Sequence, residues 1–188
     1  MAIAAALAVA LPFMFFARAS EAADSQTCAA CHGSEGNSTN PAMPSLAGQP
    51  AQAITLQLFQ FRQGSRKDPQ MTPIAANLTN AEINELAKYF STQKPAAPPR
   101  KTSPENAVAG KRLAERYNCV QCHGPSLKGL QHIPRLAGQQ FEYLRTQLRG
   151  FKAQTRADID GNMTSAAQPL SEKDIEVLAD YLAGLDAR

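Results

Sequence analysis

The chain has 188 residues, enough for one domain or two small ones, and a formal net charge of +3 from 19 basic and 16 acidic residues. It contains no basic run and only 6% aromatic residues, which argues against a nucleic-acid-binding function. Nineteen of the first 23 residues are apolar, against 63 of the remaining 165. The remainder is poor in apolar residues for side-chain cores alone, so we expect another component in the interior.

The front of the chain, residues 1–23, predicts a secretory signal peptide. Residues 1–17 are apolar apart from one proline, and small residues precede two candidate cleavage points, after Ala19 and after Ala22. An uncleaved membrane anchor is the alternative, although this stretch falls short of the roughly 20 residues that span a bilayer. In either case we expect the rest of the chain to be exported.

The residues after this front segment predict three helices. The first leads into Cys-Ala-Ala-Cys-His at 28–32, the second covers about 51–63, and the third covers about 80–91. Thr79 and Glu82 have the spacing of a capping box at the start of the third helix. No run alternates apolar and polar residues as a half-buried strand would, so the predicted fold class is all-α.

A proline-rich linker separates these helices from three further ones. Three of the five residues 95–99 are proline, which favours an extended, semi-rigid strap. The next helix opens with Ser103 as its N-cap and a proline at its first position, and it leads into Cys-Val-Gln-Cys-His at 119–123. Two more helices are predicted over about 141–153 and 172–183, the last again preceded by a capping-box pair.

The two sets of helices are copies of one another. The Cys-x-x-Cys-His motifs recur with an offset of 91, and Pro-Ser-Leu-Ala-Gly-Gln at 44–49 recurs as Pro-Arg-Leu-Ala-Gly-Gln at 134–139. The Met-Thr pairs that begin at Met71 and Met163 match with an offset of 92. Such duplication indicates one small domain written twice. The predicted organisation is a signal segment, a first domain, a linker and a second domain, at 1–23, 24–92, 93–103 and 104–188.

The four cysteines all belong to the two Cys-x-x-Cys-His motifs, as Cys28, Cys31, Cys119 and Cys122. A disulfide within each pair would close a very small loop, a thioredoxin-like redox pair expects a βαβ context, and zinc ribbons bring their pairs closer together in sequence. None of these explains the histidine that follows each pair. Two covalently bound haem c groups do, since thiols one helical turn apart reach both vinyl groups of a porphyrin. His32 and His123 are then the predicted axial ligands of the iron.

Methionine is the predicted second axial ligand of each iron. Met71 and Met163 match across the copies and follow the axial histidines by 39 and 40 residues, in predicted loops before the third helix. His132 and Met43 are weaker candidates, because neither has a matching donor in the other copy. An iron with six ligands has no vacant position for a substrate. We therefore expect outer-sphere electron transfer, with no catalytic residue and no enzyme activity.

Four features of the sequence together resemble the cytochrome c4 family of dihaem electron carriers. They are the Cys-Ala-Ala-Cys-His-Gly start, the two Pro-x-Leu-Ala-Gly-Gln segments, the Met-Thr pairs and the Tyr-Phe end of the third helix. The resemblance implies two cytochrome c domains in tandem, related by a pseudo-twofold axis, with haem propionates near their interface. It also implies that the carbonyls of Pro44 and Pro134 accept hydrogen bonds from the axial histidines. Arg66 and Arg156 are candidate propionate contacts, with solvated surface cations as the alternative.

The resemblance also implies partners for the chain. It implies single-electron transfer from quinol:cytochrome c reductase, or another periplasmic donor, to a terminal oxidase, in the periplasm of a Gram-negative bacterium. Peripheral association with the membrane is compatible with this role. A cytochrome subunit of a periplasmic dehydrogenase is the alternative function. A dihaem peroxidase or gas sensor is a third, and it would require a haem without its sixth ligand.

Overall fold

The computed structural model describes residues 24–188, so the predicted signal peptide lies outside the described residues. Within 24–188 the regular elements are helices, and the extended pairing is limited to an isolated bridge between Leu130 and Ile133. The predicted all-α class is therefore confirmed. No helix in this part of the chain is long and apolar enough to cross a membrane.

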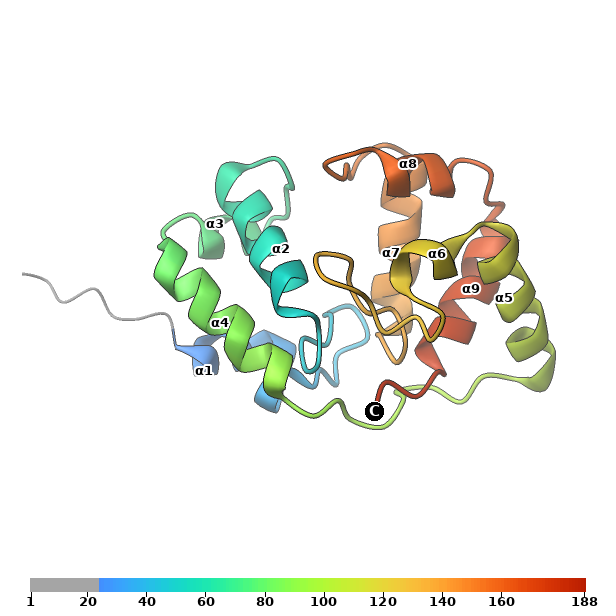
Figure 1. Cartoon of the computed structure of the whole chain (residues 1–188), viewed down its shortest axis with the longest axis horizontal. Helices are drawn as coiled ribbons and strands as arrows, with labels where there is room; N and C mark the ends of the chain where they lie inside the picture. Colours follow the sequence, from blue (N-terminus) through green and yellow to red (C-terminus); the bar gives the residue numbers. More distant parts are fainter. Residues whose placement is uncertain (1–23) are drawn as a thin grey trace, which may run out of the picture.

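The first unit is built around two antiparallel long helices. Its elements are α1 Ser25–His32, the 3-10 turn η1 Ser34–Gly36, α2 Ala51–Gln63, α3 Met71–Ala75 and α4 Asn80–Thr92. Helices α2 and α4 lie side by side (Figure 1). Ile54 of α2 packs against Leu86 and Phe90 of α4, and these residues form the core of the unit. The predicted capping box is present, with Thr79 and Glu82 each accepting a hydrogen bond from the other's backbone N–H.

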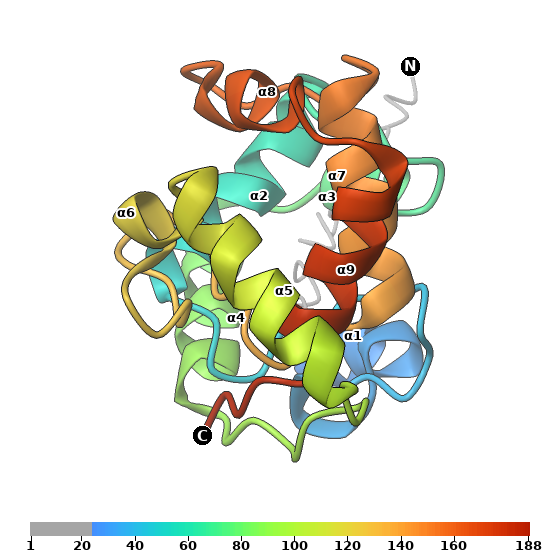
Figure 2. The ribbon, with the colours of Figure 1, turned by 90° about the vertical axis from the view of Figure 1, so that its right-hand side faces the viewer.

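The second unit repeats this arrangement, with an additional long helix before its Cys-x-x-Cys-His motif. Its elements are α5 Pro104–Arg116, α6 Cys119–His123, α7 Phe141–Lys152, α8 Asn162–Ala167 and α9 Glu172–Ala183. Ser103 caps α5 through the backbone N–H of Asn106, as the sequence predicts. Helix α5 crosses α9 at close range (Figure 2). The crossing point is Gly110, where an added Cβ would lie 2.2 Å from the Cβ of Tyr181.

Two details of the predicted elements are wrong. The single helix expected to lead into residues 119–123 is broken into α5 and α6 at Asn118, which adopts a left-handed conformation with φ of 57°. Asparagine tolerates this conformation because its short side chain can hydrogen-bond locally. The loops expected to carry Met71 and Met163 contain the short helices α3 and α8. Helices of five and six residues are too short to produce a clear apolar periodicity.

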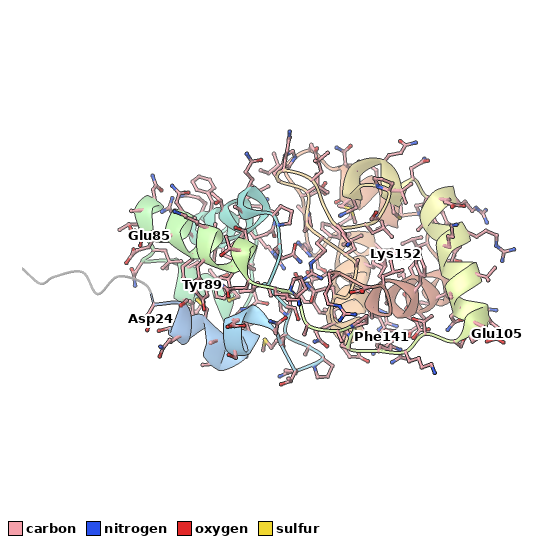
Figure 3. All side chains as sticks on the ribbon, turned by 60° about the horizontal axis from the view of Figure 1, so that its bottom comes forward. Asp24, Glu85, Tyr89, Glu105, Phe141 and Lys152 are labelled. Carbon is pink, nitrogen blue, oxygen red and sulfur yellow. The ribbon has the colours of Figure 1, made fainter. Side chains whose placement is uncertain are left out.

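The linker runs along one side of both units (Figure 1). At the first unit, the side chain of Asn37 donates to one linker carbonyl and accepts from one linker N–H. At the second unit, Arg100 pairs with the carboxylate of Asp180. The Arg100 guanidinium also lies 4.3 Å from the centre of the Phe141 ring, beside which the linker passes in Figure 3. The predicted strap is thus held at both ends by side-chain contacts.

Candidate haem sites

The cysteines occupy equivalent environments in the two units. Cys28 and Cys119 are half-buried and pack against the core of their own unit, while Cys31 and Cys122 are exposed, and none of the four forms a disulfide within residues 24–188. Burial raises the pKa of the Cys28 and Cys119 thiols, which keeps them neutral at pH 7. No group of three His, Cys, Asp or Glu side chains in residues 24–188 is arranged to hold a metal ion.

The histidine of each motif is buried and hydrogen-bonded on one side. His32 Nδ1 lies 2.8 Å from the carbonyl oxygen of Pro44, and His123 Nδ1 lies 2.8 Å from that of Pro134. A carbonyl only accepts, so Nδ1 carries the proton and the Nε2 lone pair is left to bind a metal. Burial lowers the pKa of both histidines more than the bond to the carbonyl raises it. Both rings are therefore neutral, as metal ligation requires.

The two methionines are half-buried at the start of the short helices, and Met163 packs against the core cluster that also contacts Cys119. The backbone N–H of Met71 donates to Asp68 Oδ1 at 2.9 Å, and that of Met163 donates to Asp158 Oδ2 at 2.8 Å. An aspartate thus anchors the backbone at each methionine.

These two aspartates are not among the site residues that the motifs predict. Asp68 and Asp158 match with an offset of 90, the same offset as Arg66 and Arg156, and this signal could have identified them. Burial opposes ionisation of Asp158, but hydrogen bonds from the N–H groups of Met163 and its neighbour outweigh it and lower the pKa of the carboxyl. The carboxylate is therefore ionised when it holds the Met163 backbone.

The two matched arginines meet across the interface between the units. Arg66 donates to Gln57 in its own unit and to Tyr143 and Gln147 of α7, the latter two at 3.2 Å. Arg156 donates to Gln147 in its own unit and to Gln57 across the interface at 3.2 Å. Each guanidinium also lies 4.4 Å from a phenylalanine ring of its own unit. Neither arginine is the solvated surface cation that the sequence left as the alternative.

This interface cluster brings two like charges close together. Burial and the nearby charge of Arg66 lower the pKa of Arg156 to about 10, against the opposing effects of Tyr143 and Asp158. Burial would raise the pKa of Tyr143, yet the two guanidiniums together lower it. Arg156 Nε is buried and has no hydrogen-bond partner among residues 24–188. The cluster has the donors and the charge to receive an anionic group.

The weaker ligand candidates lie elsewhere. His132 is exposed, and Met43 is half-buried in the segment just before Pro44. Each unit instead combines two thiols one helical turn apart, a neutral imidazole with a free Nε2 and a thioether. This donor set suits a covalently attached haem, whose iron supplies one-electron chemistry when bound.

The fold and its repeated motifs define a c-type cytochrome with two haem domains in tandem. A family model described as "Cytochrome c" matches residues 107–186. One described as "Cytochrome C oxidase, cbb3-type, subunit III" matches residues 17–90, beginning inside the predicted signal peptide.

Proteins similar to this chain in sequence and structure include members of the same class of c-type cytochromes. The chain is 39% identical over 179 residues to cytochrome c4 of Thiocapsa roseopersicina, a match that covers 89% of this chain and 92% of the relative. It is 35% identical to a thiosulfate dehydrogenase electron acceptor of Thiomonas intermedia, covering 85% of this chain and 79% of the relative. The crystal structure of reduced recombinant cytochrome c4 from Pseudomonas stutzeri matches with a TM-score of 0.79 and 33% identity, over 85% of this chain and 94% of that one.

The chain belongs to the cytochrome c4 family. It is an electron carrier rather than an enzyme, and it carries two covalently bound haem c groups, one in each cytochrome c domain.

Proposed function

We propose that this cytochrome is a periplasmic shuttle that carries single electrons from quinol:cytochrome c reductase, or another donor, to a terminal oxidase. The predicted signal peptide at 1–23 supports export, and the predicted domains at 24–92 and 104–188 each hold one haem. The observation that carries the proposal is the repetition of one donor set, of neutral buried histidine and half-buried methionine, in both units. A carrier with two such sites needs no substrate pocket.

In this proposal cysteine side chains attach each haem, and a histidine and a methionine bind its iron. The thioether bonds form at Cys28, Cys31, Cys119 and Cys122, and the axial ligands are His32, Met71, His123 and Met163. Histidine paired with methionine gives a higher reduction potential than two histidines, because the soft thioether favours Fe(II). A ligand on each side also leaves no vacancy for oxygen or peroxide.

Four further residues support the ligands in this proposal. The carbonyls of Pro44 and Pro134 fix the orientation of the imidazoles and raise their basicity. Arg66 and Arg156 receive the haem propionates, which would neutralise the two guanidiniums that meet at the interface. The buried and unpaired Arg156 Nε supports this role.

Carbon monoxide binding to the reduced full-length protein tests the proposal. A six-coordinate iron in each domain predicts no rapid binding. Rapid binding of one carbon monoxide per haem would contradict the methionine assignment and favour a sensor or a peroxidase.

A second candidate function is the electron acceptor of a periplasmic dehydrogenase. It is supported by the 35% identical relative named as a thiosulfate dehydrogenase electron acceptor. Stopped-flow reduction of the purified cytochrome by a thiosulfate dehydrogenase, compared with reduction by a quinol:cytochrome c reductase, separates the two candidates. Faster reduction by the reductase favours the respiratory shuttle, and faster reduction by the dehydrogenase favours the second candidate.

A further inference from the structure

Two glutamines cross the domain interface in opposite directions. Gln139 of the second unit accepts from the backbone N–H of Ser45 at 2.7 Å and donates to the Ser45 carbonyl at 2.9 Å. Gln49 of the first unit accepts from the N–H of Arg135 at 2.9 Å and donates to the Arg135 carbonyl at 3.0 Å. Both glutamines are buried, with 3% and 7% of their surface exposed. Each therefore makes a two-point contact with one residue of the other unit.

Each glutamine contacts the residue directly after a proline, and the carbonyl of that proline bonds to a predicted axial histidine. The Pro44–Ser45 peptide group accepts from His32 through its carbonyl and donates to Gln139 through its N–H. The corresponding peptide group in the second unit accepts from His123 and donates to Gln49. A continuous hydrogen-bonded chain therefore leads from each imidazole, through one peptide group, to a side chain of the other domain.

Hydrogen bonds linked through one peptide group strengthen one another. Donation by the N–H increases the negative charge on the carbonyl oxygen, which makes it a better acceptor for the imidazole Nδ1–H. A stronger bond at Nδ1 makes the histidine a more basic ligand, and a more basic ligand stabilises Fe(III). Each glutamine should therefore lower the reduction potential of the haem in the domain opposite its own.

We propose that Gln139 and Gln49 are positioning residues that tune the reduction potential of the haem in the opposite domain, Gln139 acting on His32 and Gln49 acting on His123. The inference rests on the proposed axial role of these histidines. It makes the two potentials depend on the contacts across the domain interface.

The test uses the full-length dihaem protein with Gln139→Leu, which removes both polar groups at similar volume. Gln140→Leu is the matched control. Gln140 is the next residue, is also buried, and also crosses the interface, but its side chain donates to the carbonyl of Ser38, and Ser38 contacts the hydroxyl of Ser45 rather than the Pro44–Ser45 peptide group. Redox titration followed by NMR resolves the two haems and the Nδ1–H proton of each axial histidine.

The expected result is a higher potential for the first haem alone in Gln139→Leu, with its one-electron equilibrium shifted by roughly two- to tenfold, tenfold being about 59 mV. The His32 Nδ1–H resonance should report a weaker hydrogen bond. Gln49→Leu should act on the second haem and His123 in the same way, and Gln140→Leu should move neither potential.

Two results would overturn the inference. One is equal movement of both potentials in Gln139→Leu and Gln140→Leu, which would mean that the glutamines only hold the interface together. The other is an unchanged potential and Nδ1–H resonance in both Gln139→Leu and Gln49→Leu. Failure of the proposed ligation is distinguishable, because the unsubstituted protein would then show no iron-shifted resonances of the two histidines.

Discussion

The donors proposed to face each iron are held by neighbours that are themselves fixed. The backbone at Met163 is anchored by Asp158, whose Oδ2 accepts from the Met163 N–H while its Oδ1 accepts from the backbone N–H and the hydroxyl of Thr164. The equivalent contact in the first unit joins Met71 to Asp68. A soft neutral thioether binds iron weakly. The iron alone would therefore not fix the position of the methionine, and the backbone segment that carries it must do so.

Asp158→Ala should loosen Met163 without removing any proposed ligand. The expected outcome is a weaker Fe(III)–sulfur charge-transfer band, with about half of the band retained because the first domain is unchanged. Asp186→Ala is the control, since that carboxylate bonds to Arg188 near the end of the chain and not to the segment that carries Met163. A full-strength band in Asp158→Ala would contradict the anchoring role.

The residues of the sites were predictable from the sequence to different degrees. The cysteines, histidines and methionines could be proposed because each recurs in both copies with the spacing that a haem requires. Asp68 and Asp158 recur as well, but an aspartate in a polar segment has no chemistry that marks it as functional. Its role depends on the N–H groups it accepts from, and only the folded backbone shows these.

At the scale of elements, the long helices agree with the sequence, and the differences occur in short ones. Helix α2 covers the predicted residues, and α9 begins at its predicted capping box. Helices α3 and α8 were missed because they have fewer than two turns. The break between α5 and α6 was missed because Asn118 can also continue a helix, and only the direction of the chain toward Cys119 requires its left-handed conformation.

Gly110 permits the close crossing of α5 and α9. Gly110→Ala places a Cβ 2.2 Å from the Cβ of Tyr181, so the helices must separate. We expect the free energy of unfolding to fall by about 1–3 kcal/mol, as for other overpacked sites. Urea unfolding measures this change. Val108→Ala on the same helix is the control, because Val108 is 66% exposed and its truncation should have little effect.

The capping box of α9 predicts a pH-dependent contribution to stability. Hydrogen bonds from the side chain and backbone of Ser171 hold the pKa of Asp174 below its usual value. A depressed carboxyl pKa stabilises the fold above the unfolded pKa, and the contribution is lost as the pH falls through the folded value. Asp174→Asn should therefore cost about 0.5 kcal/mol at pH 7. In urea unfolding at pH 3 the difference from the unsubstituted protein should shrink, and a constant difference would contradict this origin.

At the scale of the whole molecule, the interface joins equivalent residues of the two copies. Arg66 and Arg156 could be read from the sequence as haem contacts or as surface cations, and the choice depended on the position of the other domain. Internal repetition predicts that two domains exist, but the relative placement of their faces comes from long-range contacts such as that of Gln139 with Ser45. The sequence therefore predicts two domains with one haem each, and the contacts between the domains come only from the folded structure.

Two equivalent haem sites in one chain should each exchange one electron. Coulometric titration of the purified full-length protein, followed by its visible spectrum, measures this directly. We expect two electrons per chain, taken up in two one-electron steps, with the same type of six-coordinate spectrum for both reduced haems. Uptake of a single electron per chain, or a five-coordinate spectrum in either step, would contradict it.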